Sequence, residues 1–261
     1  MDAQPDALGG AAPAQRVPGW DAIPGLAHGF FGRHGGTSAG PFASLNASDR
    51  VGDDAAAVTG NWQRIRRALP GLSFVRMRQV HGIGVVRVDD AQMPAEDADG
   101  MLSAAAGAGL TILTADCVPL LCVAPAEHAV MALHAGWRGT LAGIAAAGLA
   151  AAQRELGVAP TAWRVAMGPS IGGCCYEVET TIGQQFVDRW GAMPDAWQPG
   201  GTHGRLDLRA ANRRILAAHG VEEAHIVDTG DCTACRSADF FSHRRSAGRA
   251  GRQVSAIGWV R

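Results

Sequence analysis

Three short apolar runs follow one another within residues 110–133, and they constrain the fold more than any other feature of the sequence. The runs cover residues 110–114, 119–123 and 129–133, with turn residues between them. Apolar runs of this length between turns are typical of buried strands. We therefore expect three buried strands in this part of the chain.

The rest of the chain mixes predicted strands and helices without a regular alternation. Further strands are predicted for residues 26–31, 85–88, 163–167, 225–228 and 254–259, and helices for residues 53–69, about 139–156, 178–190 and 206–219. No internal repeat is visible. The pattern predicts a single α+β domain with a mixed sheet over residues 19–261. Residues 1–18 are rich in Ala, Pro and Gly and are expected to form a disordered tail.

Composition excludes several partners and locations. The formal net charge is −1, so we expect neither a nucleic-acid groove nor binding to an anionic membrane surface. No apolar run reaches the roughly 18 residues that a membrane helix needs, and the N-terminus lacks the pattern of a signal peptide. Six cysteines in such a chain indicate free thiols or metal ligands in a reducing cytoplasm.

The sequence contains no lysine, so all 23 basic residues are arginine. A chain without lysine can neither form a Schiff base with pyridoxal phosphate nor use a P-loop lysine. Anionic groups of a substrate must then be bound by arginine, by backbone N–H groups or by a metal ion.

Three residues of metal-ligand type lie at the ends of predicted strands. His81 precedes one strand, Cys117 follows the first apolar run, and His134 follows the third. Strand ends are rigid positions, and two imidazoles with one thiolate leave the fourth tetrahedral position of zinc open for water. The spacing leaves open a second interpretation, in which a packed cysteine lies near two hydrogen-bonded core histidines.

Five short motifs follow one another along the chain. They are Gln79-Val80-His81-Gly82; Ala115-Asp116-Cys117 with Pro119; His134-Ala135-Gly136-Trp137-Arg138-Gly139; Gly168-Pro169-Ser170-Ile171-Gly172 with Cys175-Tyr176-Glu177-Val178; and Phe241-Ser242-His243-Arg244-Arg245. Two shorter motifs are Arg33-His34-Gly35-Gly36 and Ser44-Leu45-Asn46. In this order they resemble the signatures of the YfiH-like (laccase-domain) family, and the resemblance covers roughly residues 26–261.

The resemblance implies that His81, Cys117 and His134 are catalytic residues that bind one zinc ion per chain, with copper as the alternative metal. It implies phosphorolysis of purine nucleosides (adenosine, inosine and methylthioadenosine) together with deamination of adenosine. It also implies a layered α/β/β fold, distantly shared with cysteine-dependent toxin deamidases, in a monomer or homodimer.

Four further residues are candidates for substrate binding. Arg33 and Arg138 lie in Gly-rich turns and are predicted to bind phosphate, because a guanidinium matches phosphate bidentately. Asn46 and Cys175 lie in two of the motifs and are predicted to contact the substrate. Asp116 is predicted either to orient a metal ligand or to cap the end of a strand.

Three other functions use the same residues. Cys117 could be the nucleophile of a metal-free cysteine hydrolase, with His134 or His81 as its base. Two histidines and a cysteine also describe a blue-copper centre, but the sequence contains no His-x-His pair of the kind that multicopper oxidases use. The third alternative is an editing hydrolase acting on peptidoglycan precursors, a role linked to some members of the family.

Two remaining pairs of cysteines are assigned no metal. Cys232 and Cys235 form a C-x-x-C pattern, but no second pair is evident that would complete a four-cysteine zinc site. Cys174 and Cys175 are predicted to form a turn beside the active site.

Overall fold

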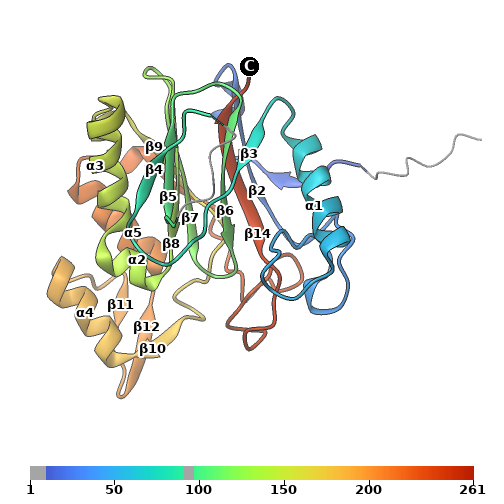
Figure 1. The fold of residues 1–261 in the computed structure, drawn as a ribbon. Helices are drawn as coiled ribbons and strands as arrows, with labels where there is room; N and C mark the ends of the chain where they lie inside the picture. Colours follow the sequence, from blue (N-terminus) through green and yellow to red (C-terminus); the bar gives the residue numbers. More distant parts are fainter. Residues whose placement is uncertain (1–9, 91–96) are drawn as a thin grey trace, which may run out of the picture.

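Two β-sheets pack face to face at the centre of the protein, and helices cover their outer faces (Figure 1). The computed structural model describes residues 10–90 and 97–261. Across the molecule, the layers are a group of helices, a six-stranded sheet, a five-stranded sheet and helix α1 (Ala55–Ala68). This arrangement confirms the predicted single α+β domain with layered mixed sheets.

The six-stranded sheet has the strand order β13-β9-β7-β8-β5-β4. Its strands are β4 (Val85–Arg87), β5 (Gly100–Ser103), β7 (Val118–Ala124), β8 (Ala129–Ala135), β9 (Arg164–Met167) and β13 (Ile226–Asp228). The hairpin of β7 and β8 is antiparallel and pairs Pro119 with His134. By contrast, β13 is parallel to β9 and β4 is parallel to β5.

The five-stranded sheet has the strand order β1-β2-β14-β6-β3. Its strands are β1 (Ala14–Gln15), β2 (Leu26–Phe31), β3 (Ser73–Val75), β6 (Ala108–Thr114) and β14 (Gln253–Trp259). The first apolar run therefore belongs to this sheet, and the other two belong to the six-stranded sheet. The chain passes from one sheet to the other in the turn that contains Asp116 and Cys117.

Strand β7 explains why the apolar runs have no polar alternation. Leu121 and Val123 belong to the hydrophobic cluster between the two sheets, whereas Leu120 and Cys122 belong to the cluster beneath the helices. Successive side chains of a strand point to opposite faces of the sheet. A strand covered on both faces is therefore apolar throughout.

Four helices lie on the side of the six-stranded sheet that faces away from the other sheet (Figure 1). They are α2 (Trp137–Ala142), α3 (Ile144–Leu156), α4 (Thr180–Trp190) and α5 (Leu208–Ala218). The prediction of one helix up to residue 156 is wrong, because Gly143 adopts a φ of 97° and separates α2 from α3. Such a left-handed residue ends a helix at little cost when it is glycine.

A small sheet beside α4 was not predicted from the sequence. Its three strands are β10 (Glu177–Glu179), β11 (Trp197–Gln198) and β12 (His203–Leu206), in the order β10-β12-β11. Short 3-10 helices occur at Trp20–Ala22, Gly40–Phe42, Pro160–Ala162 and Glu223–His225.

Part of the predicted disordered tail is structured. Strand β1 pairs with β2, Val17 is buried, and the Arg16 guanidinium donates a hydrogen bond to the carbonyl of His28. The tail prediction is therefore wrong for residues 10–18, which extend the edge of the five-stranded sheet. Residues 1–9 lie outside the described part of the chain.

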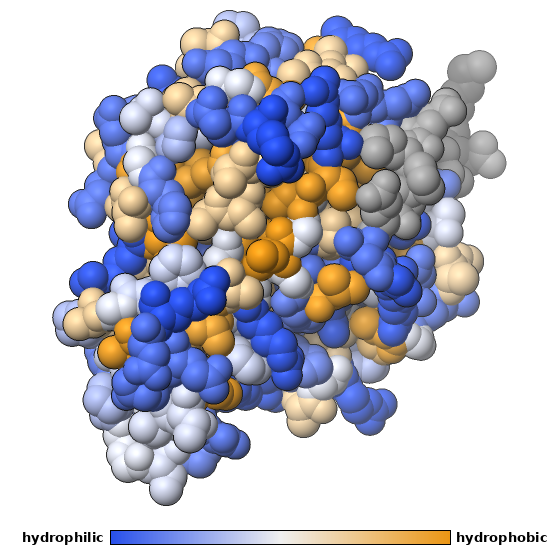
Figure 2. Space-filling view, turned by 60° about the vertical axis from the view of Figure 1, so that its left-hand side comes forward, coloured by the Kyte–Doolittle hydropathy of each residue, from blue (hydrophilic) through white to orange (hydrophobic). Residues whose placement is uncertain are grey.

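Hydrophilic side chains cover much of the surface over α3 and α4, and hydrophobic ones are visible mainly in hollows between them (Figure 2). In the described ranges, the exposed large hydrophobic side chains are Val80, Ile83 and Val227. No described helix is long and apolar enough to cross a membrane.

The packing between the sheets predicts the effect of a core substitution. Leu121 is fully buried in the middle of β7, so Leu121→Ala should lower the free energy of unfolding by about 2–5 kcal/mol. Urea denaturation measures this loss. The matched control is Val227→Ala on β13, where the side chain is 40% exposed and the change should stay within about 0.5 kcal/mol. Equal effects of the two substitutions would contradict the layered packing.

Candidate metal centre

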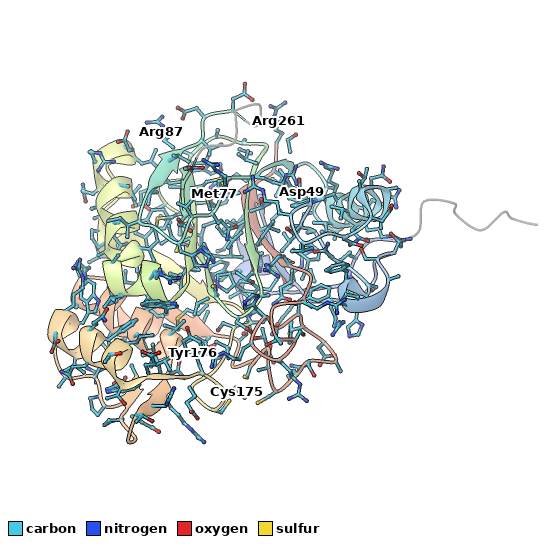
Figure 3. All side chains as sticks on the ribbon, turned by 60° about the horizontal axis from the view of Figure 1, so that its bottom comes forward. Asp49, Met77, Arg87, Cys175, Tyr176 and Arg261 are labelled. Carbon is cyan, nitrogen blue, oxygen red and sulfur yellow. The ribbon has the colours of Figure 1, made fainter. Side chains whose placement is uncertain are left out.

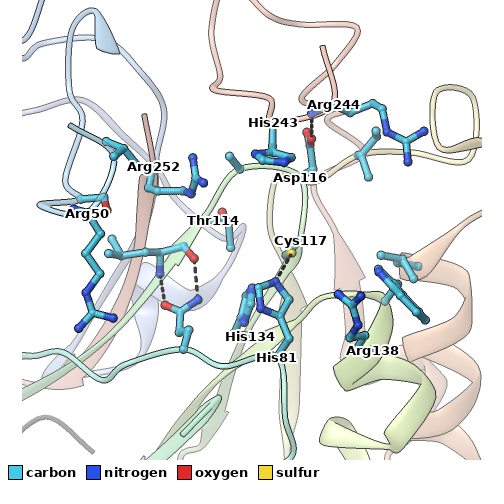
Figure 4. A pocket seen from close by; sticks show the side chains of 18 of the residues that line it. Arg50, His81, Thr114, Asp116, Cys117, His134, Arg138, His243, Arg244 and Arg252 are labelled. Carbon is cyan, nitrogen blue, oxygen red and sulfur yellow. Dashed lines mark hydrogen bonds between the residues drawn. The ribbon is translucent and has the colours of Figure 1, made fainter. Parts of the chain in front are cut away.

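His81, Cys117 and His134 come together at one end of the two sheets (Figure 4). Their ligand atoms all lie within 4.8 Å of one another, and Cys117 Sγ is 3.9 Å from His81 Nε2. A tetrahedral zinc site with these ligands separates its donor atoms by about 3.3–3.6 Å. Small side-chain movements would therefore bring all three donors onto one metal ion.

The three residues come from different elements and differ in exposure. His81 is exposed on the connection between β3 and β4, Cys117 is half-buried in the turn between β6 and β7, and His134 is buried on β8. Gln79 fixes the connection that carries His81, because its side-chain amide forms two hydrogen bonds with the backbone of Leu113 on β6. The cluster is therefore closed on the His134 side and open to solvent near His81.

Asp99 positions both histidines. Its carboxylate is fully buried and accepts a hydrogen bond of 2.8 Å from His134 Nδ1. It also accepts hydrogen bonds from three consecutive backbone N–H groups, those of Val80 (3.2 Å), His81 (2.9 Å) and Gly82 (2.6 Å). With Nδ1 engaged in this way, His134 presents Nε2 as its free ligand atom, which is the usual arrangement of a metal-binding histidine.

Charge on Asp99 is maintained despite its burial. Burial disfavours the carboxylate, but the hydrogen bonds from His134 and from the Gly82 and His81 backbone outweigh it and hold the pKa of Asp99 below its ordinary value. Asp99 is therefore an anion that supports the electron-donating character of the His134 imidazole.

Gly136 has no side chain, and this leaves room for the side chains of His81 and Cys117. A Cβ atom at this position would lie 2.9 Å from Cδ2 of His81 and 3.0 Å from Cys117 Sγ. Any larger residue would push these two side chains apart, so the backbone at Gly136 forms one wall of the centre. The donor set, the fixed ring of His134 and this wall all fit a bound metal ion.

Without a metal, Cys117 and His134 form an ion pair. Burial opposes ionisation of the thiol, but the positive charge of His134 and hydrogen bonds from both imidazoles lower the pKa of Cys117 to about 6. Burial also opposes protonation of His134, yet Cys117 and Asp99 raise the pKa of His134 to about 9. A thiolate is the ionisation state that binds metals.

The centre lies in the wall of a pocket of about 720 Å³, a size typical of sites for small molecules. Its lining includes five arginines and two aspartates, which gives it a positive charge balance. The arginines are Arg50, Arg76, Arg138, Arg244 and Arg252, and Figure 4 shows all of them except Arg76 with labels. The rings of Trp137, Tyr176 and His243 also form part of the pocket lining.

Of the predicted substrate residues, Arg138 is the one that lines this pocket. Its guanidinium packs 4.5 Å from the ring of Trp137, and it makes no hydrogen bond or ion pair with any residue that the structure describes. Arg33 lies elsewhere, because its guanidinium donates hydrogen bonds to the carbonyls of Ala43 and Ser237, both at 2.7 Å. Those bonds give Arg33 a structural role that joins two distant loops.

Asn46 and Cys175 also lie outside the pocket lining. Asn46 is fully buried, and its amide accepts a hydrogen bond from the backbone of Arg252 at 2.9 Å. Asn46 thus supports a pocket residue instead of contacting the cavity. Cys175 Sγ points to Cys235, 3.3 Å away.

Asp116 does not orient a metal ligand. Its carboxylate accepts hydrogen bonds from the Thr233 hydroxyl (2.6 Å) and from the Arg244 backbone (2.7 Å). It therefore joins the turn that carries Cys117 to the loop before β14, and the orienting carboxylate is Asp99.

Sequence reasoning missed Asp99, Tyr176, His243 and Arg252 as individual residues. Tyr176 and His243 belong to the quoted family motifs, which was the available signal. Asp99 lies in a stretch rich in Asp and Ala that gave no signal. Burial raises the pKa of Tyr176 to about 12, and the negative charge of Cys117 adds to this, so its hydroxyl stays protonated beside the centre.

Residues 27–260 match the family described as multi-copper polyphenol oxidoreductase laccase. The chain belongs to this family. It is 39% identical over 264 residues to purine nucleoside phosphorylase YlmD of Geobacillus stearothermophilus, which covers 94% of this chain and 96% of the relative. The crystal structure of that protein aligns with a TM-score of 0.85, covering 99% of this chain and 98% of the other.

Two further relatives extend the comparison. The chain is 33% identical over 230 residues to adenosine deaminase RL5 from an unknown prokaryotic organism, covering 83% of this chain and 87% of the relative. The crystal structure of YfiH from Bacillus licheniformis aligns with a TM-score of 0.86 and 30% identity, covering 97% of each chain. The family identified from the motifs is thus confirmed.

Asp99 yields a test of the metal centre. Asp99→Asn removes the buried charge that holds His134 while keeping the shape of the side chain, so zinc affinity should fall about 10- to 100-fold. Competition with a chromophoric chelator measures this affinity. The matched control is Asp97→Asn, whose exposed carboxylate pairs with Arg78 and should leave zinc affinity unchanged. Unchanged affinity in Asp99→Asn would contradict the role assigned to Asp99.

The ion pair predicts the pH dependence of the metal-free protein. Because the pKa of Cys117 is lowered to about 6, its thiolate persists as pH falls to that value, and alkylation by iodoacetamide should decline only near pH 6. Peptide mass spectrometry resolves Cys117 from the other cysteines. His134→Ala removes the nearby cation and should move the midpoint toward the ordinary thiol value of 9.0. A wild-type midpoint already near 9.0 would exclude the ion pair.

Proposed function

We propose that this protein is a zinc-dependent purine nucleoside phosphorylase that acts on adenosine, inosine and methylthioadenosine and also deaminates adenosine. The observation that carries the proposal is the His81–Cys117–His134 cluster in the wall of an arginine-lined pocket. Similarity to a protein named purine nucleoside phosphorylase and to one named adenosine deaminase supports the choice of substrate.

Zinc is the metal that we assign to the cluster, with one ion per chain. Three protein ligands with an open fourth position are typical of catalytic zinc. The family description refers to copper, but multicopper sites need paired histidines, and the sequence has no His-x-His pair. When bound, the ion lowers the pKa of an attacking water and withdraws charge from a substrate oxygen.

Binding of phosphate is assigned to the pocket arginines, above all to Arg138. This residue has no hydrogen-bond or ion-pair partner among the described residues, so its guanidinium can bind phosphate without breaking a hydrogen bond or an ion pair. Arg244 instead donates to the carbonyl of Glu177, and Arg252 donates to the carbonyls of Ala250 and Gly251. In this proposal, phosphate bound at Arg138 is the nucleophile that attacks C1′ of the ribose.

The purine is assigned to the ring surfaces of the pocket. Trp137, Tyr176 and His243 present planar side chains in the lining, and aromatic rings stack on bases regardless of their substituents. The protonated hydroxyl of Tyr176 provides a hydrogen-bond donor beside the rings. Such a site accommodates adenine and hypoxanthine alike, as the three proposed nucleosides require.

A metal-free cysteine hydrolase is the second candidate function. The lowered pKa of Cys117 and the raised pKa of His134 favour it, because a thiolate beside an imidazolium is the resting state of many cysteine nucleophiles. Elemental analysis together with activity separates the two functions. Full nucleoside turnover by metal-free protein would favour the cysteine hydrolase and reject the zinc enzyme.

Arg138→Ala tests the assignment of phosphate. Loss of a hydrogen bond to a charged group costs about 1.5–3 kcal/mol, so the KM for phosphate should rise about 10- to 150-fold. Deamination uses water in place of phosphate, so its rate should change much less. Ribose 1-phosphate and inosine formed from adenosine report the two reactions separately.

Two arginine variants serve as controls for that experiment. Arg154→Ala removes an exposed arginine that pairs with Glu155 and should change neither reaction. Arg33→Ala should lower the melting temperature through its lost carbonyl contacts but leave the KM for phosphate unchanged. Equal losses of phosphorolysis and deamination in Arg138→Ala would show that Arg138 does not bind phosphate.

A further inference from the structure

Cys174, Cys175, Cys232 and Cys235 form a second cluster, separate from the three residues of the first centre. Their four sulfur atoms lie within 4.8 Å of one another. Cys175 Sγ is 3.3 Å from Cys235 Sγ, and Cys174 Sγ is 3.6 Å from Cys235 Sγ and 3.8 Å from Cys175 Sγ. All four are free thiols. The prediction that the C-x-x-C pattern lacks a second cysteine pair is therefore wrong.

The topology of the six-stranded sheet brings these cysteines together. Strands β9 and β13 are neighbours and parallel, so the loops that follow them leave the same edge of the sheet. The loop after β9 carries Cys174 and Cys175, and the loop after β13 carries Cys232 and Cys235. A bridge between Ser170 and Cys232 holds the two loops in register.

We propose that this cluster is a structural zinc site in which the four cysteines bind one Zn²⁺ ion. Four thiolates about 2.3 Å from a tetrahedral zinc ion place their sulfur atoms about 3.8 Å apart. The three sulfur separations of 3.3–3.8 Å among Cys174, Cys175 and Cys235 are close to this value. A disulfide would need two sulfurs about 2.05 Å apart, which is shorter than any of these three separations, whereas one zinc ion binds all four sulfurs at distances of this kind.

The surroundings of Cys232 support a thiolate cluster. Its sulfur accepts a hydrogen bond of 3.3 Å from the backbone N–H of Gly172. A Cβ atom at Gly172 would lie 3.3 Å from Cys174 Sγ and 3.0 Å from a guanidinium nitrogen of Arg209. The Arg209 guanidinium, which is buried and pairs with Asp228 at 3.1 Å, therefore lies near the sulfur of Cys174. Binding of Zn²⁺ releases the four thiol protons and leaves a net charge of −2 on the cluster.

The site would join two parts of the pocket wall. The loop after β9 continues from Cys175 directly to Tyr176, and the loop after β13 leads on to His243 and Arg244, all of which line the pocket. Figure 3 shows Cys175 beside Tyr176 at the edge of the molecule, on the side away from Met77. A zinc ion bound there holds these loops together without touching the substrate.

Metal content measured on tag-free protein tests this proposal. We expect two zinc ions per wild-type chain and one in Cys235→Ser, which should also have a lower melting temperature. Cys117→Ser should likewise retain one zinc ion while losing nucleoside turnover. Each substitution should thus remove zinc from its own centre and leave the zinc ion of the other centre bound. Cys122→Ala, which removes a buried thiol of β7 outside both clusters, should keep two.

X-ray absorption at the zinc edge of Cys117→Ser gives a readout that does not depend on folding of the Cys235 variant. The remaining zinc should have four sulfur neighbours at about 2.3 Å and no nitrogen neighbours. Either of two results would overturn the proposal. One is wild-type protein with a single zinc ion that Cys117→Ser loses completely, and the other is a disulfide among the four cysteines in native protein that contains no second zinc ion.

Discussion

The rest of the centre depends on the hydrogen bonds that the buried carboxylate of Asp99 accepts. It accepts hydrogen bonds from the His134 ring and from the backbone N–H groups of Val80, His81 and Gly82. One anion thus fixes the ring of one histidine and the main chain that carries the other. Because a buried charge is stable only when it is hydrogen-bonded, displacement of either histidine would remove one of the four hydrogen bonds that Asp99 accepts. The geometry of the centre and the stability of its surroundings are therefore linked.

The two stacked sheets supply the rigidity that this arrangement needs. His134 belongs to β8, which is buried along its whole length, and Cys117 lies where the chain crosses from one sheet to the other. His81 is the exposed member, on a connection held by Gln79 and Asp99. The centre is thus fixed on its buried side and accessible on the side of the pocket, as a reaction with a small molecule requires.

The features that the sequence predicted are those that follow from local patterns. Apolar runs identified β6, β7 and β8, and motifs identified His81, Cys117 and His134. What sequence reasoning missed depends on contacts between distant residues. Asp99 acts on residues 81 and 134, and Arg33 is held by a carbonyl 204 positions away. Likewise, the four-cysteine cluster forms only because β9 and β13 are adjacent in the sheet, which no spacing along the chain reveals.

A zinc titration of metal-free protein tests most directly whether the His81–Cys117–His134 centre is a catalytic zinc site for purine nucleosides. Formation of ribose 1-phosphate from adenosine and phosphate is measured as zinc is added in steps. A catalytic zinc site predicts negligible product without metal, a rate that rises as zinc fills the centre, and a plateau once it is full. Full phosphorolysis before any zinc is added, or none after both centres are filled, would contradict it.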